Sequence, residues 1–321
     1  MVLKRRIFKQ DEFRETGFGN RVIEGVQRLM NKDGSSNVRR TGIPLNEITN
    51  VYHSLITMKW WKFNLLILSA YLIVNLIFAS IYFFIDPSHV GGMMYSTEFE
   101  KFMEVFFFSA QSLTTVGYGR LNPTGFFDST VAVVESFLGL LGFALATGLL
   151  YGRFSRPVAN IIFSKNALIA PYQGFTAVMV RLANKNKSEL LDSQAIIVMA
   201  YIDEINGIKT RKFSTLKLEL TKVNMLTMSW TVVHPIDEES PLYGWMEEDF
   251  IKKEIELLVL INAYEETFAQ TVHARTSYLY NEIIFGAKFN SMIKPDERGA
   301  VSVKLNRVNE HEIIPLFEEA V

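Results

Sequence analysis

Two long apolar stretches stand out in the hydrophobic pattern of this chain. Residues 63–85 run for 23 residues without a charge. As a helix they would measure about 34 Å, enough to cross a bilayer core of about 30 Å. Residues 127–151 are apolar apart from Asp128 at their start and Glu135 inside them. Both stretches are predicted to be transmembrane helices.

The segment between these two helices has a different pattern. Residues 98–113 carry too many acids for a third crossing, yet their apolar side chains recur at helical steps. Those side chains are Phe99, Phe102, Met103, Phe106 and Phe107. The pattern indicates a short helix that enters the membrane and returns, which is tolerated only where protein buries its ends.

An amphipathic segment precedes the first membrane helix. In residues 44–58, Pro44 can open a helix, and apolar residues follow at three- and four-residue steps on one face. Lys59, Trp60 and Lys62 come next, as is typical where a helix lies flat in the membrane interface. We predict such an interfacial helix, called the slide helix below; the alternative is a helix packed on a soluble core. Residues 1–43 are charged and interrupted by glycines, which indicates a loop-rich segment.

The pattern changes again after residue 156. From 157 to 321 the apolar residues fall in short, partly alternating runs separated by turn-prone pieces. The runs are 177–182, 195–202, 213–220, 227–233, 255–263 and 300–305. Runs of this length and spacing predict a β-sandwich of about 160 residues. The predicted fold is therefore a membrane α domain, with two transmembrane helices and a re-entrant pore helix, joined to an all-β sandwich.

The peptide Thr115-Val116-Gly117-Tyr118-Gly119 directly follows the predicted re-entrant helix. A peptide of this kind lines potassium selectivity filters, in which backbone carbonyl oxygens replace the hydration shell of the ion. Gly117 and Gly119 supply the backbone freedom that this conformation demands. The alternative is an ordinary glycine turn. Its position between two predicted spans favours the filter, with K⁺ coordinated by the backbone carbonyls and the Thr115 hydroxyl.

Residues around this peptide have predicted supporting roles. A helix that ends at Thr114 would aim the negative end of its dipole at a cation, and Thr114 would support the filter from that end. Phe107, in the 106–108 aromatic cluster, is predicted to pack behind it. Glu135 must face protein, pore or water, because a lipid-facing carboxylate would cost a few kcal/mol. We predict a pore-cavity or filter-support role for Glu135, with a structural hydrogen bond as the alternative.

Charge and composition narrow the functional class. The net charge is −1, there are no cysteines, and the five histidines are scattered without a pair at metal-ligand spacing. No catalytic motif is present, so we expect neither nucleic-acid binding, nor an enzyme, nor a cofactor or metal other than K⁺ as the permeant ion. Residues 1–62 carry twelve Lys or Arg against six acids, whereas residues 86–126 carry two against four. The positive-inside tendency therefore places both termini in the cytoplasm.

Several segments of the second half match a known pattern in the correct order. Residues 229–243 contain His-x-Ile-Asp-x-x-Ser-Pro-Leu-Tyr, residues 274–278 contain Ala-Arg-x-Ser-Tyr, and residues 282–286 contain Glu-Ile-x-x-Gly. These segments resemble the inward-rectifier potassium channel family, especially its prokaryotic members, and residues 33–38 are similar to the family's N-terminal strand. The resemblance implies a homotetramer whose sandwich is immunoglobulin-like and lies in the cytoplasm.

The resemblance also implies contacts with anionic membrane lipids. The family's basic cluster near the membrane surface corresponds here to Lys59, Lys62, Arg153 and Arg156, with Trp60 beside them. We therefore expect that contacts of these residues with lipid and with the cytoplasmic domain gate conduction.

Three positions depart from the family pattern. The second-span position that carries an acid in strong rectifiers is Phe143, and an apolar residue cannot attract a polyamine, so weak rectification is expected. Besides K⁺, other copies of the chain and anionic lipids, the resemblance implies polyamines and divalent cations as blockers. The glutamate and arginine that flank the filter in animal members correspond to Gln111 and Leu121, so that ion pair is absent.

Two aromatic and two glycine positions in the second span are candidate gating elements. Phe143 and Tyr151 are eight residues apart and so lie within about 80° of each other on a helix. If that face lines the pore, four copies of each would form apolar constrictions that close by dewetting; the alternative is that both face lipid or the core. Gly139 and Gly148 permit either a close helix approach or a bend, and are predicted as hinges.

Together these features predict an inward-rectifier-type potassium channel with multiple spans in the cell (inner) membrane. Its predicted parts are a cytoplasmic segment (1–43), the slide helix (44–58), the pore domain (59–156, with pore helix and filter at 98–119) and the cytoplasmic sandwich (157–321). The alternative is a membrane-anchored sensor module that binds a ligand and has a non-conducting pore.

Overall fold

The computed structural model describes residues 28–38, 41–42, 51–85, 87–156, 159–186, 188–205, 207–295 and 301–316. Contacts within the chain divide it into two units. One unit comprises residues 41–156, and the other comprises the residues up to 40 together with those from 157 onward. Residues 1–27 and the first part of the predicted slide helix, 44–50, lie outside the described residues.

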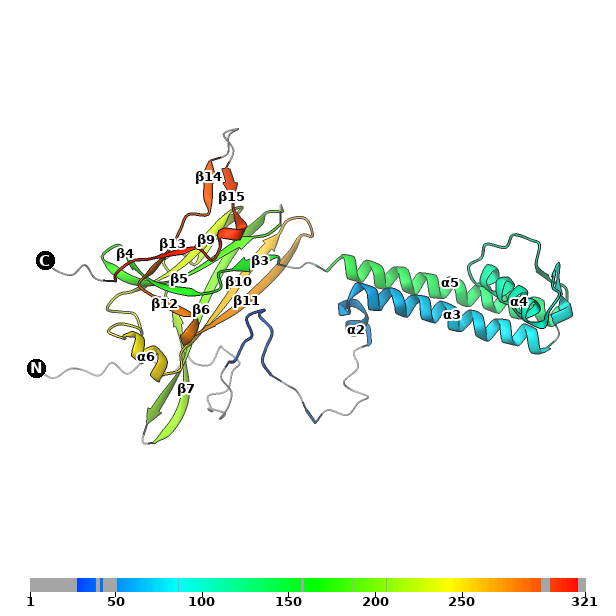
Figure 1. The fold of residues 1–321 in the computed structure, drawn as a ribbon, viewed down its shortest axis with the longest axis horizontal. Coiled ribbons are helices and arrows are strands. Elements are labelled where there is room, and N and C mark those ends of the chain that lie inside the picture. The colour runs from blue at the N-terminus through cyan, green and yellow to red at the C-terminus, as the bar shows by residue number, and fades with distance from the viewer. Residues whose placement is uncertain are drawn as a thin grey trace, which may run out of the picture. The chain divides into compact units, whose positions relative to one another are not determined.

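The first unit is helical (Figure 1). It contains α2 (Val51–Thr57), α3 (Trp60–Ile85), α4 (Glu98–Leu113) and α5 (Phe126–Phe154). Both α3 and α5 are long and apolar enough to cross a membrane, and each extends beyond the apolar stretch that predicted it. The short strands β1 (Val90–Gly91) and β2 (Asn122–Pro123) pair with each other outside the helices.

The start of α4 is specified by a capping box. The Thr97 hydroxyl accepts a hydrogen bond from the Glu100 backbone N–H, and the Glu100 carboxylate accepts one from the Thr97 N–H. Two of the unpaired donors at the helix N-terminus are thereby satisfied. The helix then continues to Leu113, immediately before the predicted filter.

Packing in this unit is centred on α3 and α4. Phe78 and Tyr82 of α3 are buried against Val105 and Phe108 of α4, and the rings of Tyr82 and Phe108 lie 5.1 Å apart. In α5, by contrast, the fully buried side chains are two acids, Asp128 and Glu135, while its large apolar side chains are mostly exposed on the single chain. The apolar surface of α5 is therefore left for lipid or for other copies of the protein.

The second unit is a sandwich of two five-stranded sheets. In the first sheet the order is β11-β10-β6-β7, and β8 also pairs with β6. In the second the order is β12-β4-β5-β3, and β9 also pairs with β5; the β12–β4 pair is parallel. The strands are β3 (Ile161–Phe163), β4 (Ala167–Tyr172), β5 (Phe175–Asn184), β6 (Leu190–Ile205), β7 (Ile208–Leu216), β8 (Lys222–Leu226), β9 (Ser229–Ile236), β10 (Glu256–Glu265), β11 (Gln270–Leu279) and β12 (Ile283–Phe285).

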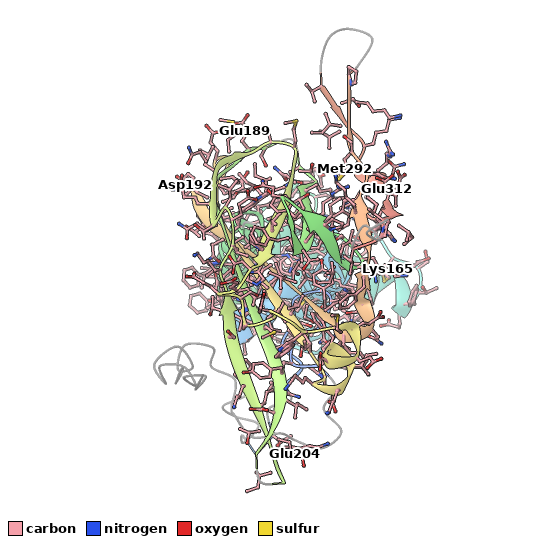
Figure 2. All side chains as sticks on the ribbon, turned by 90° about the vertical axis from the view of Figure 1, so that its left-hand side faces the viewer. Lys165, Glu189, Asp192, Glu204, Met292 and Glu312 are labelled. Carbon is pink, nitrogen blue, oxygen red and sulfur yellow. The ribbon has the colours of Figure 1, made fainter. Side chains whose placement is uncertain are left out.

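Smaller elements complete this unit. They are α6 (Glu247–Lys252), the pair β13 (Ala287–Phe289) with β16 (His311–Ile313), and the pair β14 (Ile293–Pro295) with β15 (Val301–Val303). The long β6–β7 hairpin turns at Gly207, which has φ +79°, and Figure 2 shows Glu204 near its tip, away from the body of the sandwich.

The core explains why several strands read as continuous apolar runs. Val178 and Val180 of β5 point into the main core between the sheets, with Ile197 of β6 and Val259 of β10. Alternate residues of β5, such as Met179, are buried on the opposite face by a second cluster that includes Ala287 and Phe289 of β13. Strands covered on both faces lose the alternation of a half-exposed strand. The edge strand β11 alternates polar and buried positions, and sequence analysis did not identify it.

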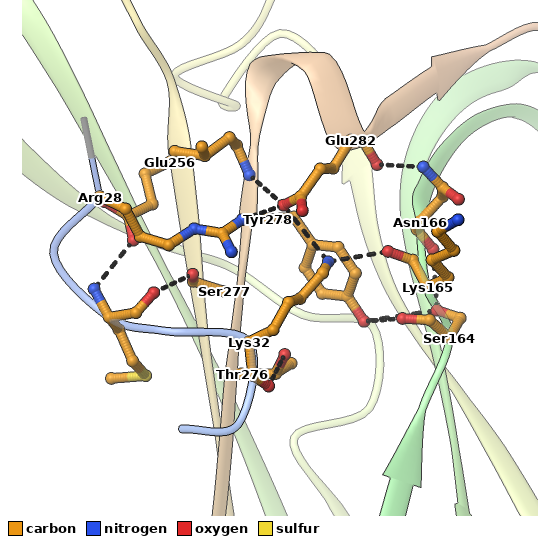
Figure 3. A network of polar contacts seen from close by, with 12 residues as sticks. Arg28, Lys32, Ser164, Lys165, Asn166, Glu256, Thr276, Ser277, Tyr278 and Glu282 are labelled. Carbon is orange, nitrogen blue, oxygen red and sulfur yellow. Dashed lines mark hydrogen bonds and ion pairs between the residues drawn. The ribbon is translucent and has the colours of Figure 1, made fainter. Parts of the chain in front are cut away.

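Residues 28–38 are anchored on the outer face of the first sheet (Figure 3). Met30 is buried there, and the Glu256 carboxylate accepts hydrogen bonds from the backbone N–H groups of Leu29 (2.7 Å) and Met30 (3.1 Å). Burial raises the pKa of Glu256, although these bonds partly offset it. Lys32 lies 3.8 Å above the centre of the Tyr278 ring.

The strand predicted at residues 33–38 is instead a turn. Met30 and Ser36 form a single antiparallel bridge across it. Gly34 has φ +78°, and a Cβ there would lie 2.5 Å from the Arg275 carbonyl oxygen. Only glycine therefore allows this close approach of two backbones.

His234, near the end of β9, holds the following loop in place. Its buried ring has Nδ1 2.6 Å from the Lys217 carbonyl oxygen and Nε2 2.8 Å from the Ser240 hydroxyl. A carbonyl only accepts, so Nδ1 carries the proton, and Nε2 accepts from Ser240. Burial lowers the pKa of His234, so the folded protein keeps the ring neutral.

We predict that this histidine makes the sandwich unit less stable in acid. In the unfolded chain a histidine binds a proton near pH 6.5, whereas folded His234 resists it, so its contribution is complete above about pH 6.5 and falls by up to about 1.4 kcal/mol per pH unit below it. Thermal unfolding of the full-length protein from pH 7.5 to 5 measures this. The melting-temperature deficit of His234→Gln should shrink as the pH falls. His273→Gln, at an exposed position on β11, is the matched control for loss of a histidine side chain. A constant deficit for His234→Gln would contradict the prediction.

Candidate ion-conduction site

The predicted filter peptide leaves α4 in a defined turn. Three backbone N–H groups still donate to the last turns of the helix, from Thr114 to Ala110, from Thr115 to Ser112 and from Val116 to Gln111. The Thr114 hydroxyl donates to the Ala110 carbonyl at 2.7 Å. Thr114 therefore caps its own helix, and the peptide begins at the C-terminal, negative end of the α4 dipole.

Residues with positive φ alternate with residues without it along the peptide. Thr115, Gly117 and Gly119 have φ values of +59°, +52° and +88°, whereas Val116 and Tyr118 between them do not have positive φ. Successive residues of opposite hand turn their N–H groups to one side of the chain, and the carbonyl oxygens consequently line the other side. Such a row of carbonyls is what a dehydrated cation requires.

Thr115 carries a strain that the sequence did not reveal. A β-branched residue in the left-handed region costs roughly 1–2 kcal/mol, whereas glycine adopts it without penalty. Such strain persists where the surrounding structure enforces it, and it concentrates at functional sites. The peptide is also uncovered in the single chain, with Val116 51% and Tyr118 81% exposed.

The segment after the predicted filter peptide is held in place by Arg120. Arg120 forms an ion pair with Glu104 of α4 at 2.7 Å and donates to the Gly92 carbonyl at 3.0 Å. A Cβ at Gly92 would lie 1.8 Å from the Arg120 carbonyl oxygen, so this approach also requires glycine. Sequence analysis considered only the positions of the family's ion pair. The structure shows a different pair, and Arg120 was the residue to test because it is the only basic residue between the filter and α5.

Glu135 lies inside the protomer rather than on an open surface. Its carboxylate is fully buried and accepts hydrogen bonds from the Tyr82 hydroxyl of α3 at 2.9 Å and from the Ser109 hydroxyl of α4 at 2.5 Å. These contacts favour the filter-support and structural alternatives over an open cavity.

Gly139 allows a close helix approach. A Cβ there would lie 1.9 Å from the Leu113 carbonyl oxygen at the end of α4, and α5 runs through this position as a continuous helix. Of the two alternatives left open by the sequence, the contact with Leu113 supports a close helix approach at Gly139. Gly148 has no heavy atom within 4 Å of its Cβ position. Between Glu135 and Gly139 on α5, the Ser136 hydroxyl donates to the Ser112 carbonyl of α4 at 3.1 Å.

The predicted gate residues lack cover in the single chain. Phe143 and Tyr151 are each 73% exposed on α5. Phe107 is also about half exposed, whereas its neighbour Phe108 is the aromatic residue buried against Tyr82.

Arg153 connects the end of α5 to α2. Its guanidinium donates to the backbone carbonyls of Leu55 (2.6 Å) and Met58 (2.8 Å), and it lies 4.5 Å from the ring centres of both Trp60 and Phe63. The Leu55 carbonyl belongs to the last turn of α2, where carbonyls lack a partner within the helix, and Met58 directly follows that helix. Arg153 and Trp60, both predicted to contact lipid, thus have partners within the protein.

Two more features of this region bear on the predicted lipid contacts. A Cβ at Gly152 would lie 2.9 Å from the Tyr52 hydroxyl of α2, a close approach that sequence analysis missed. Lys59, Lys62 and Arg156 remain exposed, which leaves their charges available to ligands outside the chain.

Comparison with known proteins agrees with this arrangement. Residues 30–157 match the inward rectifier potassium channel transmembrane domain, and residues 161–320 match the inward rectifier potassium channel C-terminal domain. The chain is 37% identical over 281 residues to the inward rectifier potassium channel Kirbac3.1 of Paramagnetospirillum magnetotacticum, covering 86% of this chain and 93% of that protein.

More distant relatives are animal channels. The human G protein-activated inward rectifier potassium channel 2 is 25% identical over 317 residues, covering 91% of this chain and 73% of its own. Among solved structures, the sporulation control protein Spo0M of Bacillus subtilis is similar at a TM-score of 0.24 and 8% identity, covering 42% of this chain and 59% of its own, which is too low to carry an argument. The two domain matches and the first relative carry the conclusion: this chain belongs to the inward rectifier potassium channel family.

Proposed function

We propose that the protein is a homotetrameric channel that conducts K⁺ through a pore lined by residues 115–119 of four copies. The carbonyl oxygens of Thr115, Val116, Gly117 and Tyr118 coordinate the ion, with the Thr115 hydroxyl at the inner end. The observation that carries the proposal is the alternation of positive φ at Thr115, Gly117 and Gly119, because it directs the carbonyls to one side of the peptide. Ion conduction of this kind requires no enzyme chemistry and no resident cofactor.

Assembly follows from the exposed surfaces. The channels of this family are tetrameric, and a carbonyl row from one chain forms only one wall of an ion site. The exposed apolar side chains of α5 and the uncovered Val116 and Tyr118 supply surface for neighbouring copies and for lipid.

The membrane arrangement rests on α3, α5 and charge. With two spans, the segments before α3 and after α5 lie on the same side of the membrane. The excess of Lys and Arg in residues 1–62 indicates that this is the cytoplasmic side of the cell (inner) membrane. Lys59, Lys62 and Arg156 then lie at the cytoplasmic surface, where anionic lipid headgroups attract exposed cations. Arg153, with Trp60, joins the slide helix to α5, so a lipid contact that moves α2 also moves the end of α5.

The gate is assigned to Phe143 and Tyr151, with Gly148 as the point where α5 bends. Their exposure on one side of α5 leaves both rings free to meet their counterparts from other copies. Phe143 also places no carboxylate in the pore for a polyamine or a divalent blocker, which supports weak rectification.

Backbone conformation, rather than space, should make Gly117 essential. Gly117 has φ +52° and no heavy atom within 4 Å of its Cβ position, so Gly117→Ala introduces strain without a clash in the single chain. We expect ⁸⁶Rb⁺ uptake into liposomes that contain the purified channel to fall at least about tenfold, since roughly 1–2 kcal/mol of strain is introduced in each copy.

The matched control is Gly207→Ala, which has φ +79° and equally open surroundings in the β6–β7 turn. It should retain uptake. Barium-sensitive uptake by the unaltered channel is the basic requirement. Its absence across lipid compositions and pH would overturn the proposal in favour of a non-conducting sensor.

The gate assignment predicts a change in open probability. Replacing Phe143 or Tyr151 with alanine widens and wets an apolar constriction, so single-channel recordings should show open probability rising several-fold. Leu145→Ala is the control, because Leu145 is also exposed but lies about 160° around the helix from the mean direction of the two aromatic residues. Unchanged open probability in both aromatic variants would rule out this gate.

A further inference from the structure

A buried polar cluster joins the two long helices, α3 and α5, to α4. It consists of Tyr82 and Asn75 on α3, Ser109 on α4 and Glu135 on α5, and each of these residues is fully buried. Three of the four are linked through the Glu135 carboxylate, one oxygen of which accepts from Tyr82 and the other from Ser109.

The cluster has little freedom to rearrange. The Ser109 hydroxyl has one hydrogen, and its bond to Glu135 at 2.5 Å is shorter than its approaches to Asn75, at 3.2 Å to Oδ1 and 3.3 Å to the carbonyl. Asn75 is itself held, since its Nδ2 donates to the Tyr71 carbonyl at 2.7 Å. Because these side chains are fully buried, a displaced hydroxyl or carboxylate would lose its partner at substantial cost. Distances between the three helices are thereby set at this level.

Ser109 transmits this constraint toward the filter. It lies on α4 six residues before Thr115. The last turn of α4, between Ser109 and the filter peptide, is held by the same stretch of α5. Ser136 bonds to the Ser112 carbonyl, and Gly139 packs against the Leu113 carbonyl. The three contacts follow one another along α5 and fall within the last two turns of α4. A shift at Ser109 therefore moves the helix end from which the filter begins.

We propose that Tyr82, Glu135 and Ser109 are positioning residues for ion selectivity: they set the position of α4 and, through it, the spacing of the filter carbonyls. The inference rests on the proposed conduction through residues 115–119. Discrimination between K⁺ and Na⁺ depends on how the carbonyls are placed and how freely they move, so loosening α4 should admit Na⁺ while leaving the filter residues themselves unchanged.

Two variants test the network, each removing one hydroxyl. Tyr82→Phe and Ser109→Ala each leave Glu135 with one donor. The cost of one unpaired buried group corresponds to a change of about fivefold or more in the population of a displaced α4. We expect the ratio of ²²Na⁺ to ⁸⁶Rb⁺ uptake in liposomes to rise by about that factor. Ser80→Ala is the matched control, because the exposed Ser80 hydroxyl donates within α3 to the Leu76 carbonyl at 2.6 Å.

The outcomes separate this proposal from the proposed function. No ⁸⁶Rb⁺ uptake by the unaltered channel would reject conduction itself. A conducting channel whose uptake ratio is the same in Tyr82→Phe, Ser109→Ala and Ser80→Ala would reject only the positioning role. Failure of both network variants to form tetramers, while Ser80→Ala assembles, would assign the cluster to folding and also overturn the proposal. Raised ratios in the two network variants alone would support it.

Discussion

The need to point successive carbonyl oxygens to one side of the chain is the constraint on which the membrane unit depends. A peptide meets it by alternating the hand of its backbone, as at Thr115, Gly117 and Gly119. Glycine accepts this at two positions, but Thr115 does not, so its conformation needs support from its surroundings. The capped α4 helix, the Arg120–Glu104 ion pair and the contacts with α5 provide that support.

Helix α5 reverses the usual pattern of burial. Its fully buried side chains are the acids Asp128 and Glu135, and its apolar residues face outward. In a membrane this is the expected arrangement, because lipid solvates the apolar surface and only protein can satisfy the carboxylates. Small side chains at the α4 contact, Ser136 and Gly139, let the helices approach closely enough for hydrogen bonds to form. One helix thus holds α4 on one face and leaves the rest of its surface for lipid and neighbouring copies.

The β unit uses buried polar groups in a comparable way at its outer surface. Glu256 accepts two backbone N–H groups from residues 29 and 30, and Ser277 donates to the Met30 carbonyl. These bonds hold a segment far away in sequence against the sheet, and Met30 adds apolar burial. The segment that leads toward the membrane helices is thereby fixed on the cytoplasmic domain at residues 28–38.

Much of this protein is determined by its sequence alone. Apolar length predicted the two long helices, short apolar runs predicted the sandwich, and the peptide at 115–119 predicted the filter, because each prediction depends on local chemistry. Tertiary structure decided what depends on contacts between distant segments. These are the partners of Glu135, the packing role of Gly139, the Glu104–Arg120 pair and the binding of Arg153 to α2. A carboxylate or a glycine in an apolar helix indicates that another part of the protein packs against it. Only the folded chain shows which residue that is.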